Sequence, residues 1–370
     1  MKLFIIKAFV VCIRILYAPM KLRKTQNKIL YLSRQSNEKS QDMLLLEKEL
    51  SKRKPELKQV FRLRKLKDES AITLSYIFGI IGDMWQMASA KVVITDTYSI
   101  PVSCLTHKSS LKVVQIWHAM GAVKKFSLQS AGKTQGRDLG VAKAMSMHKN
   151  YDFVLAPSSA TAELYCEAFG CKRENIKILS LPRVDVILDN KTRKEEFIKL
   201  NPRYEGKKIA AYVPTFRDKD ELYAQRLVKA FELSESISLV VSSHPLSKTA
   251  KQGLYKFNGE FSSLDLMKLA DYVITDYSAC SFEAALLQKP LYFYVPDYEI
   301  YSAEQGLNVD VKKELSAVSF EDEAKLLQSI NADNYDFNML SSFTEKYIEN
   351  RNTNNTEQVA EFICSLTERV

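Results

Sequence analysis

Short apolar runs alternate with longer segments of helical periodicity over most of the chain, and the stretch 266–296 shows this pattern most clearly. Tyr272–Thr275 is an apolar run typical of a buried parallel strand. A polar turn, residues 276–278, follows it. From Ala279 the apolar positions take helical spacing until Pro290 opens another strand. The stretch therefore predicts helix, strand, turn, helix and strand in succession.

The same alternation in both halves of the chain predicts parallel sheets with helices on both faces. The expected strands are 29–32, 60–63, 92–95, 113–117, 153–156, 176–181, 209–213, 238–242, 272–275 and 291–295. The expected helices are 36–50, 71–90, 159–169, 222–233, 279–289, 320–330, 336–349 and 358–366. A polar segment, 189–208, reads as a connection between domains. Because 370 residues exceed one ordinary domain, we expect an α/β fold of two Rossmann-like domains that face a cleft, residues 26–195 and 205–370, the second including the terminal helices.

Residues 1–25 form a separate expected element, an apolar helix followed by a basic cluster. Leu3–Ala18 is apolar except for Lys7 and Arg14, which share a helical face. The run is short for a membrane span, which needs about 20 apolar residues, and no small-residue cleavage site of a signal peptide follows it. We expect a monotopic helix in the inner leaflet of the membrane. The alternative is an ordinary buried helix of the first domain.

The charge distribution supports the membrane interpretation. The formal net charge is +9, and residues 1–70 hold 18 Lys and Arg against 7 Asp and Glu, so the positive excess is N-terminal. Such an excess suits an anionic membrane face or a nucleic acid, and the apolar helix beside it favours the membrane. The six cysteines include no C-x-x-C pair, which fits a reducing, cytoplasmic setting without a zinc site.

Polar residues that could bind a ligand fall where predicted strands end, the edge at which open α/β sheets bind ligands. Ser278 lies between a strand and a helix, whose N-terminal N–H groups suit a phosphate; alternatively it only caps the helix. His118 follows the strand 113–117, and its neutral imidazole suits proton transfer; alternatively it packs beside Trp117. Lys124 either holds an acidic acceptor or is solvated.

Three more strand ends carry similar chemistry. Arg183 and Arg217 follow predicted strands, and their forked donors suit phosphate; alternatively they form ion pairs with Asp185 or Asp218. His244 leaves the strand 238–242 and is able to donate to a phosphate oxygen.

Five motifs together resemble the CDP-glycerol glycerophosphotransferases of teichoic-acid synthesis, which have the two-Rossmann GT-B architecture. They are WHAMGAVKKF at 117–126, LPRVD at 181–185, YVPTFRD at 212–218, SHPL at 243–246 and ADYVITDYSACSFEAALLQKPLYFY at 270–294. The last is the most specific, and the motifs span about half of the chain. SRQS at 33–36 adds a weaker likeness.

The resemblance implies roles for the residues in these motifs. His118 is expected to be the catalytic base on the acceptor hydroxyl, and His244 the second histidine, which contacts the donor phosphate. The substrate-binding residues are expected to be Arg183, Arg217, Asp218, Lys124, Asp276, Ser278, Ala279 and Glu283. Ser278 and the following helix are expected to cradle the diphosphate, and Glu283 to hold the ribose hydroxyls.

The implied reaction transfers a polyol phosphate, namely glycerol phosphate from CDP-glycerol, and releases CMP. The acceptor is a hydroxyl of a lipid-linked glycan or polyol phosphate. The reaction takes place at the cytoplasmic face of the membrane. No obligatory cofactor or metal is expected, although Mg²⁺ bound to the diphosphate stays open. We expect no nucleic-acid partner. The alternatives are a CDP-ribitol-dependent transferase, a sugar-nucleotide glycosyltransferase of the same architecture, and a non-catalytic membrane scaffold.

Three positions depart from the family pattern. Ala279 stands where many members have a second serine, and Ala119 where many have glycine. Gln305 replaces an expected arginine, a change that bears on the identity of the transferred polyol more than on the chemistry.

Overall fold

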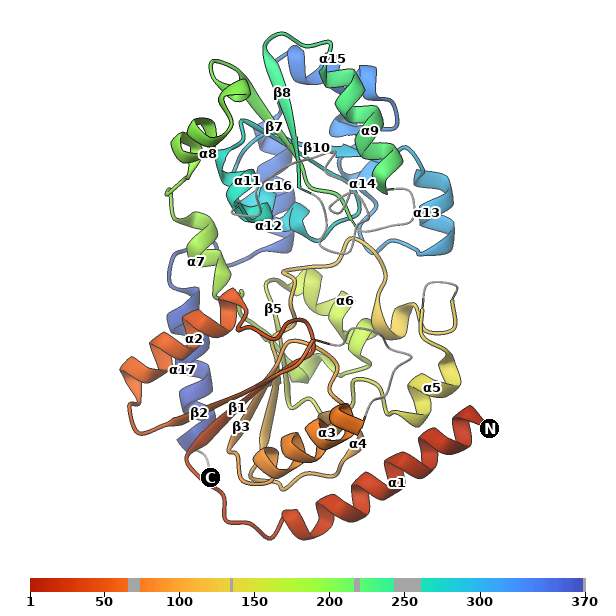
Figure 1. The fold of residues 1–370 in the computed structure, drawn as a ribbon, viewed down its shortest axis with the longest axis vertical. Coiled ribbons are helices and arrows are strands. Elements are labelled where there is room, and N and C mark those ends of the chain that lie inside the picture. The colour runs from red at the N-terminus through yellow and green to blue at the C-terminus, as the bar shows by residue number, and fades with distance from the viewer. Residues whose placement is uncertain (66–73, 134–135, 216–219, 243–260, 369–370) are drawn as a thin grey trace. The chain divides into compact units, whose positions relative to one another are not determined.

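The computed structural model describes residues 1–65, 74–133, 136–215, 220–242 and 261–368. The chain forms two compact units, each built on one parallel sheet (Figure 1). Unit 1 comprises Met1–Met120, Phe126–Val186 and Asn352–Val370. Unit 2 comprises Gly121–Lys125 and Ile187–Arg351.

Within the described residues, six parallel strands form the sheet of unit 1 in the order β2-β1-β3-β4-β5-β6. They are β1 (Lys28–Ser33), β2 (Lys58–Leu63), β3 (Val92–Thr95), β4 (Lys112–Gln115), β5 (Phe153–Ala156) and β6 (Ile176–Ile178). In the register of the three central strands, Leu32 pairs with Thr95 and Thr95 with Gln115. The residues that follow these positions therefore meet at the carboxyl edge of the sheet.

Helices cover both faces of this sheet. They are α1 (Lys2–Met20), α2 (Gln41–Arg53), α3 (Leu74–Met87), α4 (Ile100–Cys104), α5 (Leu139–Ala144), α6 (Ser159–Phe169) and α17 (Asn355–Glu368), and α7 (Arg183–Leu188) crosses into unit 2. Leu30, Leu32 and Val93 face a core shared with α1, α3 and α6, while α2 packs against α17 (Figure 1). The period of two along each strand explains this division, because successive side chains point to opposite faces.

The helix α1 packs one face into unit 1 and leaves the other face exposed. Val10, Ile13 and Tyr17 are buried in the core of unit 1, so one face packs as an ordinary core helix does. The opposite face is apolar and exposed, with Phe4 76% and Ile15 67% exposed. By length and composition α1 also qualifies as a membrane span.

Within the described residues of unit 2, five parallel strands follow the order β11-β10-β9-β7-β8. They are β7 (Lys208–Tyr212), β8 (Ile237–Val241), β9 (Tyr272–Thr275), β10 (Leu291–Tyr294) and β11 (Ser319–Phe320). The helices are α8 (Lys194–Leu200), α9 (Asp220–Phe231), α11 (Ser263–Leu269), α12 (Cys280–Leu286), α13 (Tyr298–Glu304), α14 (Val311–Glu314), α15 (Glu323–Asn331) and α16 (Phe337–Tyr347).

The sequence predicted β3, β5, β9 and α6 to the residue. Gly170 ends α6 in the left-handed conformation with φ 59°, which glycine adopts without steric cost. The expected domain bounds differ from the structure, since residues 1–25 belong to unit 1 and Gly121–Lys125 to unit 2. The last helix, α17, belongs to unit 1 rather than to the second domain, because it packs on α2, and the supposed connection 189–208 contains α8 of unit 2.

Candidate active site

Each sheet reverses its strand order at one point, and the contacts of His118 and Asp276 lie there. In unit 1 the chain runs outward from β1 to β2 and then returns to β3 on the other side of β1. In unit 2 the reversal falls between β7 and β9. Such switch points leave a crevice outside the carboxyl ends of the strands, and this crevice is the usual ligand site of open α/β sheets.

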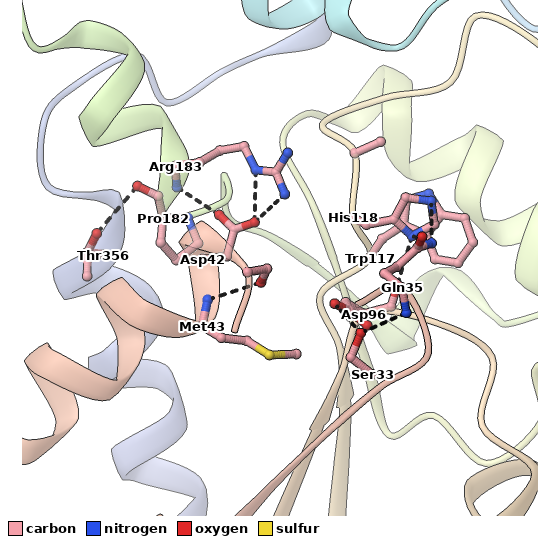
Figure 2. A network of polar contacts seen from close by, with 12 residues as sticks. Ser33, Gln35, Asp42, Met43, Asp96, Trp117, His118, Pro182, Arg183 and Thr356 are labelled. Atoms are coloured by element: carbon pink, nitrogen blue, oxygen red, sulfur yellow. Dashed lines mark hydrogen bonds and ion pairs between the residues drawn. The ribbon is translucent and has the colours of Figure 1, made fainter. Parts of the chain in front are cut away.

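At the switch point of unit 1, His118 is held by groups that follow β1 and β3 (Figure 2). Its Nδ1 lies 2.9 Å from the backbone oxygen of Asp96. The Asp96 carboxylate accepts a hydrogen bond from the Ser33 hydroxyl at 3.0 Å, and that hydroxyl accepts one from the Gln35 N–H at 3.1 Å. The Gln35 amide nitrogen lies 3.3 Å from Nε2 of His118.

These contacts fix the protonation pattern of the His118 ring. A carbonyl oxygen only accepts, so Nδ1 carries the hydrogen and Nε2 has the lone pair, which faces the Gln35 amide as a donor. Burial lowers the pKa of His118 to about 4, and the nearby positive charge of Arg183 adds to this, against the opposing bond to Asp96. The imidazole is therefore neutral near pH 7 and able to accept a proton at Nε2. Burial also raises the pKa of the Asp96 carboxyl to about 6.

Trp117 sets the direction in which His118 leaves the sheet. Its φ is 57°, a left-handed value that is costly for a bulky residue. Its N–H donates to Gln115 Oε1 at 2.8 Å, and its ring packs 4.0 Å from the His118 ring and 5.1 Å from Phe126, between centroids. His118 does pack beside Trp117, as the alternative interpretation expected. This packing does not protonate Nε2, so it does not exclude a role as a base.

Arg183 is paired with Asp42 on α2 and not with Asp185 (Figure 2). Its backbone N–H and its Nε each donate to the Asp42 carboxylate at 2.8 Å, and Asp42 is 1% exposed. Asp185 instead caps α17 by accepting from the N–H groups of Asn355 and Thr356, each at 2.9 Å. Arg183 therefore has a structural partner besides its predicted substrate role.

At the switch point of unit 2, Asp276 ties the ends of β7 and β9 together. Its carboxylate is fully buried and accepts a hydrogen bond from the N–H of Thr215 at 2.8 Å. The next residue, Tyr277, is also buried, stacks on Tyr301 at 4.0 Å between centroids, and donates to Asp297. This rigid turn presents Ser278, which is partly exposed.

The start of α12 lacks a capping side chain. Ala279 is the N-cap residue and makes no side-chain cap bond. The Ser278 hydroxyl accepts from the Cys280 N–H at 3.4 Å and from the Cys280 thiol at 3.0 Å, and burial raises the pKa of this thiol to about 12. Ser278 is thus only a weak local cap, and Glu283 lies in the first turn of the helix.

Lys124 lies in a five-residue segment, Gly121–Lys125, that belongs to unit 2. Its backbone forms an antiparallel bridge with Leu307, and Gln305 donates from its amide to the Lys125 carbonyl at 2.6 Å. A Cβ on Gly121 would lie 2.6 Å from the ring of Phe282 on α12, so this close approach requires glycine. Gln305, which replaces the expected arginine, therefore helps to hold the segment that follows His118.

Three predicted site residues, Arg217, Asp218 and His244, lie outside the described residues. Sequence reasoning missed Asp42, Gln35 and Asp96 as partners of the predicted residues. A signal for Asp96 was present in the sequence: the letters VITD occur at 93–96 and at 273–276, and in each case the Asp directly follows the strand. Among the described residues no group of three or more His, Cys, Asp or Glu side chains is placed to hold a metal ion.

Comparison with solved structures gives the class of fold. The solved structure of the wall teichoic acid polymerase TagF matches with a TM-score of 0.71 over 99% of this chain and 98% of that chain, at 16% identity. The architecture is therefore GT-B-like, as predicted.

Comparison of sequences gives the family. The family model of CDP-Glycerol:Poly(glycerophosphate) glycerophosphotransferase matches residues 16–365, and the chain belongs to this family. A teichoic acid ribitol-phosphate primase of Bacillus spizizenii is 27% identical over 331 residues, 85% of each chain. A teichoic acid glycerol-phosphate primase of Bacillus subtilis is 26% identical over 297 residues, 78% of this chain and 77% of that protein. The predicted family is confirmed, and the chain is an enzyme of the teichoic acid primase and polymerase family.

Proposed function

We propose that this protein transfers glycerol phosphate from CDP-glycerol to a hydroxyl of a lipid-linked acceptor in cell-surface polymer synthesis. The observation that carries the proposal is the bond between His118 Nδ1 and the Asp96 carbonyl at a sheet switch point, since it leaves Nε2 as a proton acceptor. Family membership supplies the reaction class.

In the proposed reaction, Nε2 of His118 takes the proton of the acceptor hydroxyl as its oxygen attacks the phosphorus that bears the polyol. A new P–O bond forms, the P–O bond to the cytidine monophosphate breaks, and CMP leaves. Such a transfer depends mainly on positioning and on stabilising charge. The general base contributes a factor on the order of 100 to 10,000.

The donor is proposed to bind unit 2, with its diphosphate near Ser278 and Ala279. The buried Asp276 fixes this turn through Thr215, and the N-cap of α12 carries no competing side-chain cap. Glu283 is proposed to contact the ribose. Lys124, Arg183, Arg217, Asp218 and His244 complete the proposed substrate set. No resident metal is proposed, and Mg²⁺ would enter only with the diphosphate.

CDP-ribitol is the second candidate donor, because the ribitol-phosphate primase matches this chain over 85% of its length. A screen of purified protein with radiolabelled CDP-glycerol, CDP-ribitol and UDP-sugars tests the donor. We expect turnover of CDP-glycerol and the addition of a single unit, as the name primase of both relatives suggests. Turnover of CDP-ribitol alone would reassign the polyol, and turnover of a UDP-sugar alone would overturn the proposal.

The acceptor is proposed to be reached from the cytoplasmic membrane face through α1. Because Val10, Ile13 and Tyr17 belong to the core, deleting residues 1–20 would also damage unit 1. The cleaner test replaces the exposed Phe4, Val11 and Ile15 with serine. This variant should lose binding to lipid vesicles and keep turnover of a soluble acceptor analogue; unchanged vesicle binding would contradict a membrane role for α1.

A further inference from the structure

Unit 1 contains a hollow at the amino end of its sheet, opposite to the edge that holds His118. Its volume is about 550 Å³, and Lys112 at the start of β4 and Asp152 just before β5 line it together with Arg14 of α1. Nothing in the proposed reaction uses this end of the sheet.

The hollow is cationic. Among the described lining residues, Arg14, Lys108, Lys112 and Lys149 are basic, and Asp152 is the acidic one. The Asp152 carboxylate is already engaged, since it accepts from the Val113 N–H at 2.8 Å and lies 3.6 Å from the Lys112 ammonium. An excess of positive charge therefore faces the open space.

The carbonyl groups that would repel an anion are satisfied. The Asn150 side-chain amide donates to the carbonyls of Val102, Ser103 and Leu105 at 3.0, 3.2 and 2.8 Å, around the end of α4. The Arg14 Nε donates to the Cys104 carbonyl at 2.8 Å. Arg14 thus lines the hollow while bonded to its wall.

A neutral histidine joins α1 to the wall of the hollow. The Nε2 of His107 lies 2.7 Å from the Val102 carbonyl, and Nδ1 lies 3.4 Å from the Tyr17 hydroxyl. Burial lowers the pKa of His107. The wall is thus rigidly connected to the helix that has the exposed apolar face.

The geometry of α1 relates the hollow to that face. Lys7, Arg14 and Lys21 are spaced by seven residues and form one stripe beside the buried face. Exposed apolar residues, including Phe4, Val11 and Ile15, continue around the helix from this stripe. A helix that lies at a membrane with such a stripe brings its cations to the level of the lipid headgroups.

We propose that the hollow binds the phosphate of an anionic phospholipid while the exposed face of α1 contacts its acyl chains. This inference rests on the proposed membrane role of α1 and names the ligand class that would orient unit 1 on the membrane. The shared chemistry is a phosphate ester, which a soluble anion also offers, so the test separates the two sources.

The test measures co-sedimentation of the full chain with three kinds of vesicle. The first is pure phosphatidylcholine, the second is phosphatidylcholine with phosphatidylglycerol, and the third is phosphatidylcholine with oleate. The second and third kinds have the same surface charge. Arg14→Gln/Lys149→Gln removes two cations from the hollow and keeps the apolar face. Lys48→Gln/Lys52→Gln on α2 is the matched control, because neither residue lines the hollow.

The R14Q/K149Q variant should bind phosphatidylglycerol vesicles at least about 30-fold more weakly than the unchanged chain, because it loses two charge-assisted hydrogen bonds to the phosphate in the hollow. Binding to phosphatidylcholine and oleate vesicles should change less than threefold, and K48Q/K52Q should behave as the unchanged chain. An equal loss on oleate vesicles, or no loss on phosphatidylglycerol vesicles, overturns the inference.

Two further measurements keep the sources and the proposals apart. Titration with soluble glycerophosphoglycerol should show no saturation below millimolar concentration; tight binding would assign the hollow to a soluble anion and overturn the lipid assignment. The R14Q/K149Q variant should keep turnover of CDP-glycerol with a soluble acceptor analogue. If neither the variants nor the unchanged chain turn over any CDP-polyol, the proposed function is wrong. The vesicle experiment would still show whether the hollow binds a phospholipid.

Discussion

The backbone N–H and the Nε of Arg183 both reach the carboxylate of Asp42 at 2.8 Å, across 141 positions of sequence. Asp42 is 1% exposed, so Arg183 neutralises a buried charge. The same guanidinium depresses the pKa of His118 through space. Arg183 therefore couples the stability of unit 1 to the electrostatics of the proposed base.

Replacing Arg183 with alanine should destabilise the protein by about 3–5 kcal/mol, because it leaves the buried Asp42 carboxylate without its counter-ion. Urea unfolding monitored by circular dichroism measures the loss. The double variant Asp42→Leu/Arg183→Met should recover most of the stability. If the recovered double variant turns over CDP-glycerol with unchanged kcat and KM, the substrate role of Arg183 is refuted and only the structural role stays.

Replacing His118 with asparagine should lower kcat by about 100- to 10,000-fold, because the proton acceptor is lost. Binding of CDP-glycerol, measured by titration calorimetry, should stay within a few-fold of the unchanged protein. Normal turnover by the variant would refute the assignment of His118 as the base.

The acid limb of kcat/KM should fall near pH 4 rather than near the ordinary 6.5 of histidine. The pKa of His118 is lowered to about 4 by burial, so its neutral form, which accepts the proton, persists well below pH 6.5 and disappears as the pH falls through 4. Rates with a soluble acceptor from pH 7 down to the limit of stability measure this limb. A limb centred near 6.5 would mean that the free enzyme exposes the ring to water.

The residues found from the sequence are those whose own side chains carry the chemistry at a strand end. His118 and Asp276 follow predicted strands, and the rule that parallel strands end at one edge places them at the switch points. Asp96 was missed because it holds His118 through its backbone carbonyl, which any residue provides. Asp42 was missed because helical periodicity cannot reveal a partner that folds back after β6.

Stability should fall as the pH drops from 6.5 toward 3, partly through His148. This ring is 3% exposed and bonded to the Tyr151 hydroxyl at 2.9 Å, and burial lowers its pKa to about 3. The unfolded chain binds a proton near the ordinary pKa of 6.5, so the stability from the neutral ring is complete above 6.5 and is lost as the pH falls. His148→Asn, which tolerates the φ of 60° here, should reduce this slope by up to about 1.4 kcal/mol per pH unit. Equal slopes for both proteins in urea unfolding at pH 6.5 and 5 would contradict the prediction.

Replacing Gly121 with alanine should destabilise unit 2 by about 1–3 kcal/mol, because the new Cβ would approach the Phe282 ring to 2.6 Å. The ring belongs to α12, so the change should also weaken donor binding at the start of that helix. Gly121→Ala/Phe282→Leu should recover part of both losses. A single variant as stable as the unchanged protein would show that the segment 121–125 shifts without cost.

Ala279 tests whether backbone N–H groups hold the donor diphosphate. Its φ of −65° already matches proline, so Ala279→Pro removes one N–H donor with little change in backbone shape. We expect Ala279→Pro to raise the KM for CDP-glycerol by about tenfold or more, the equivalent of one charge-assisted hydrogen bond. Ser278→Ala is the matched control and should raise KM less, because the Ser278 hydroxyl is already bonded to the Cys280 N–H and thiol. The reverse order of the two effects would assign the phosphate contact to the Ser278 side chain.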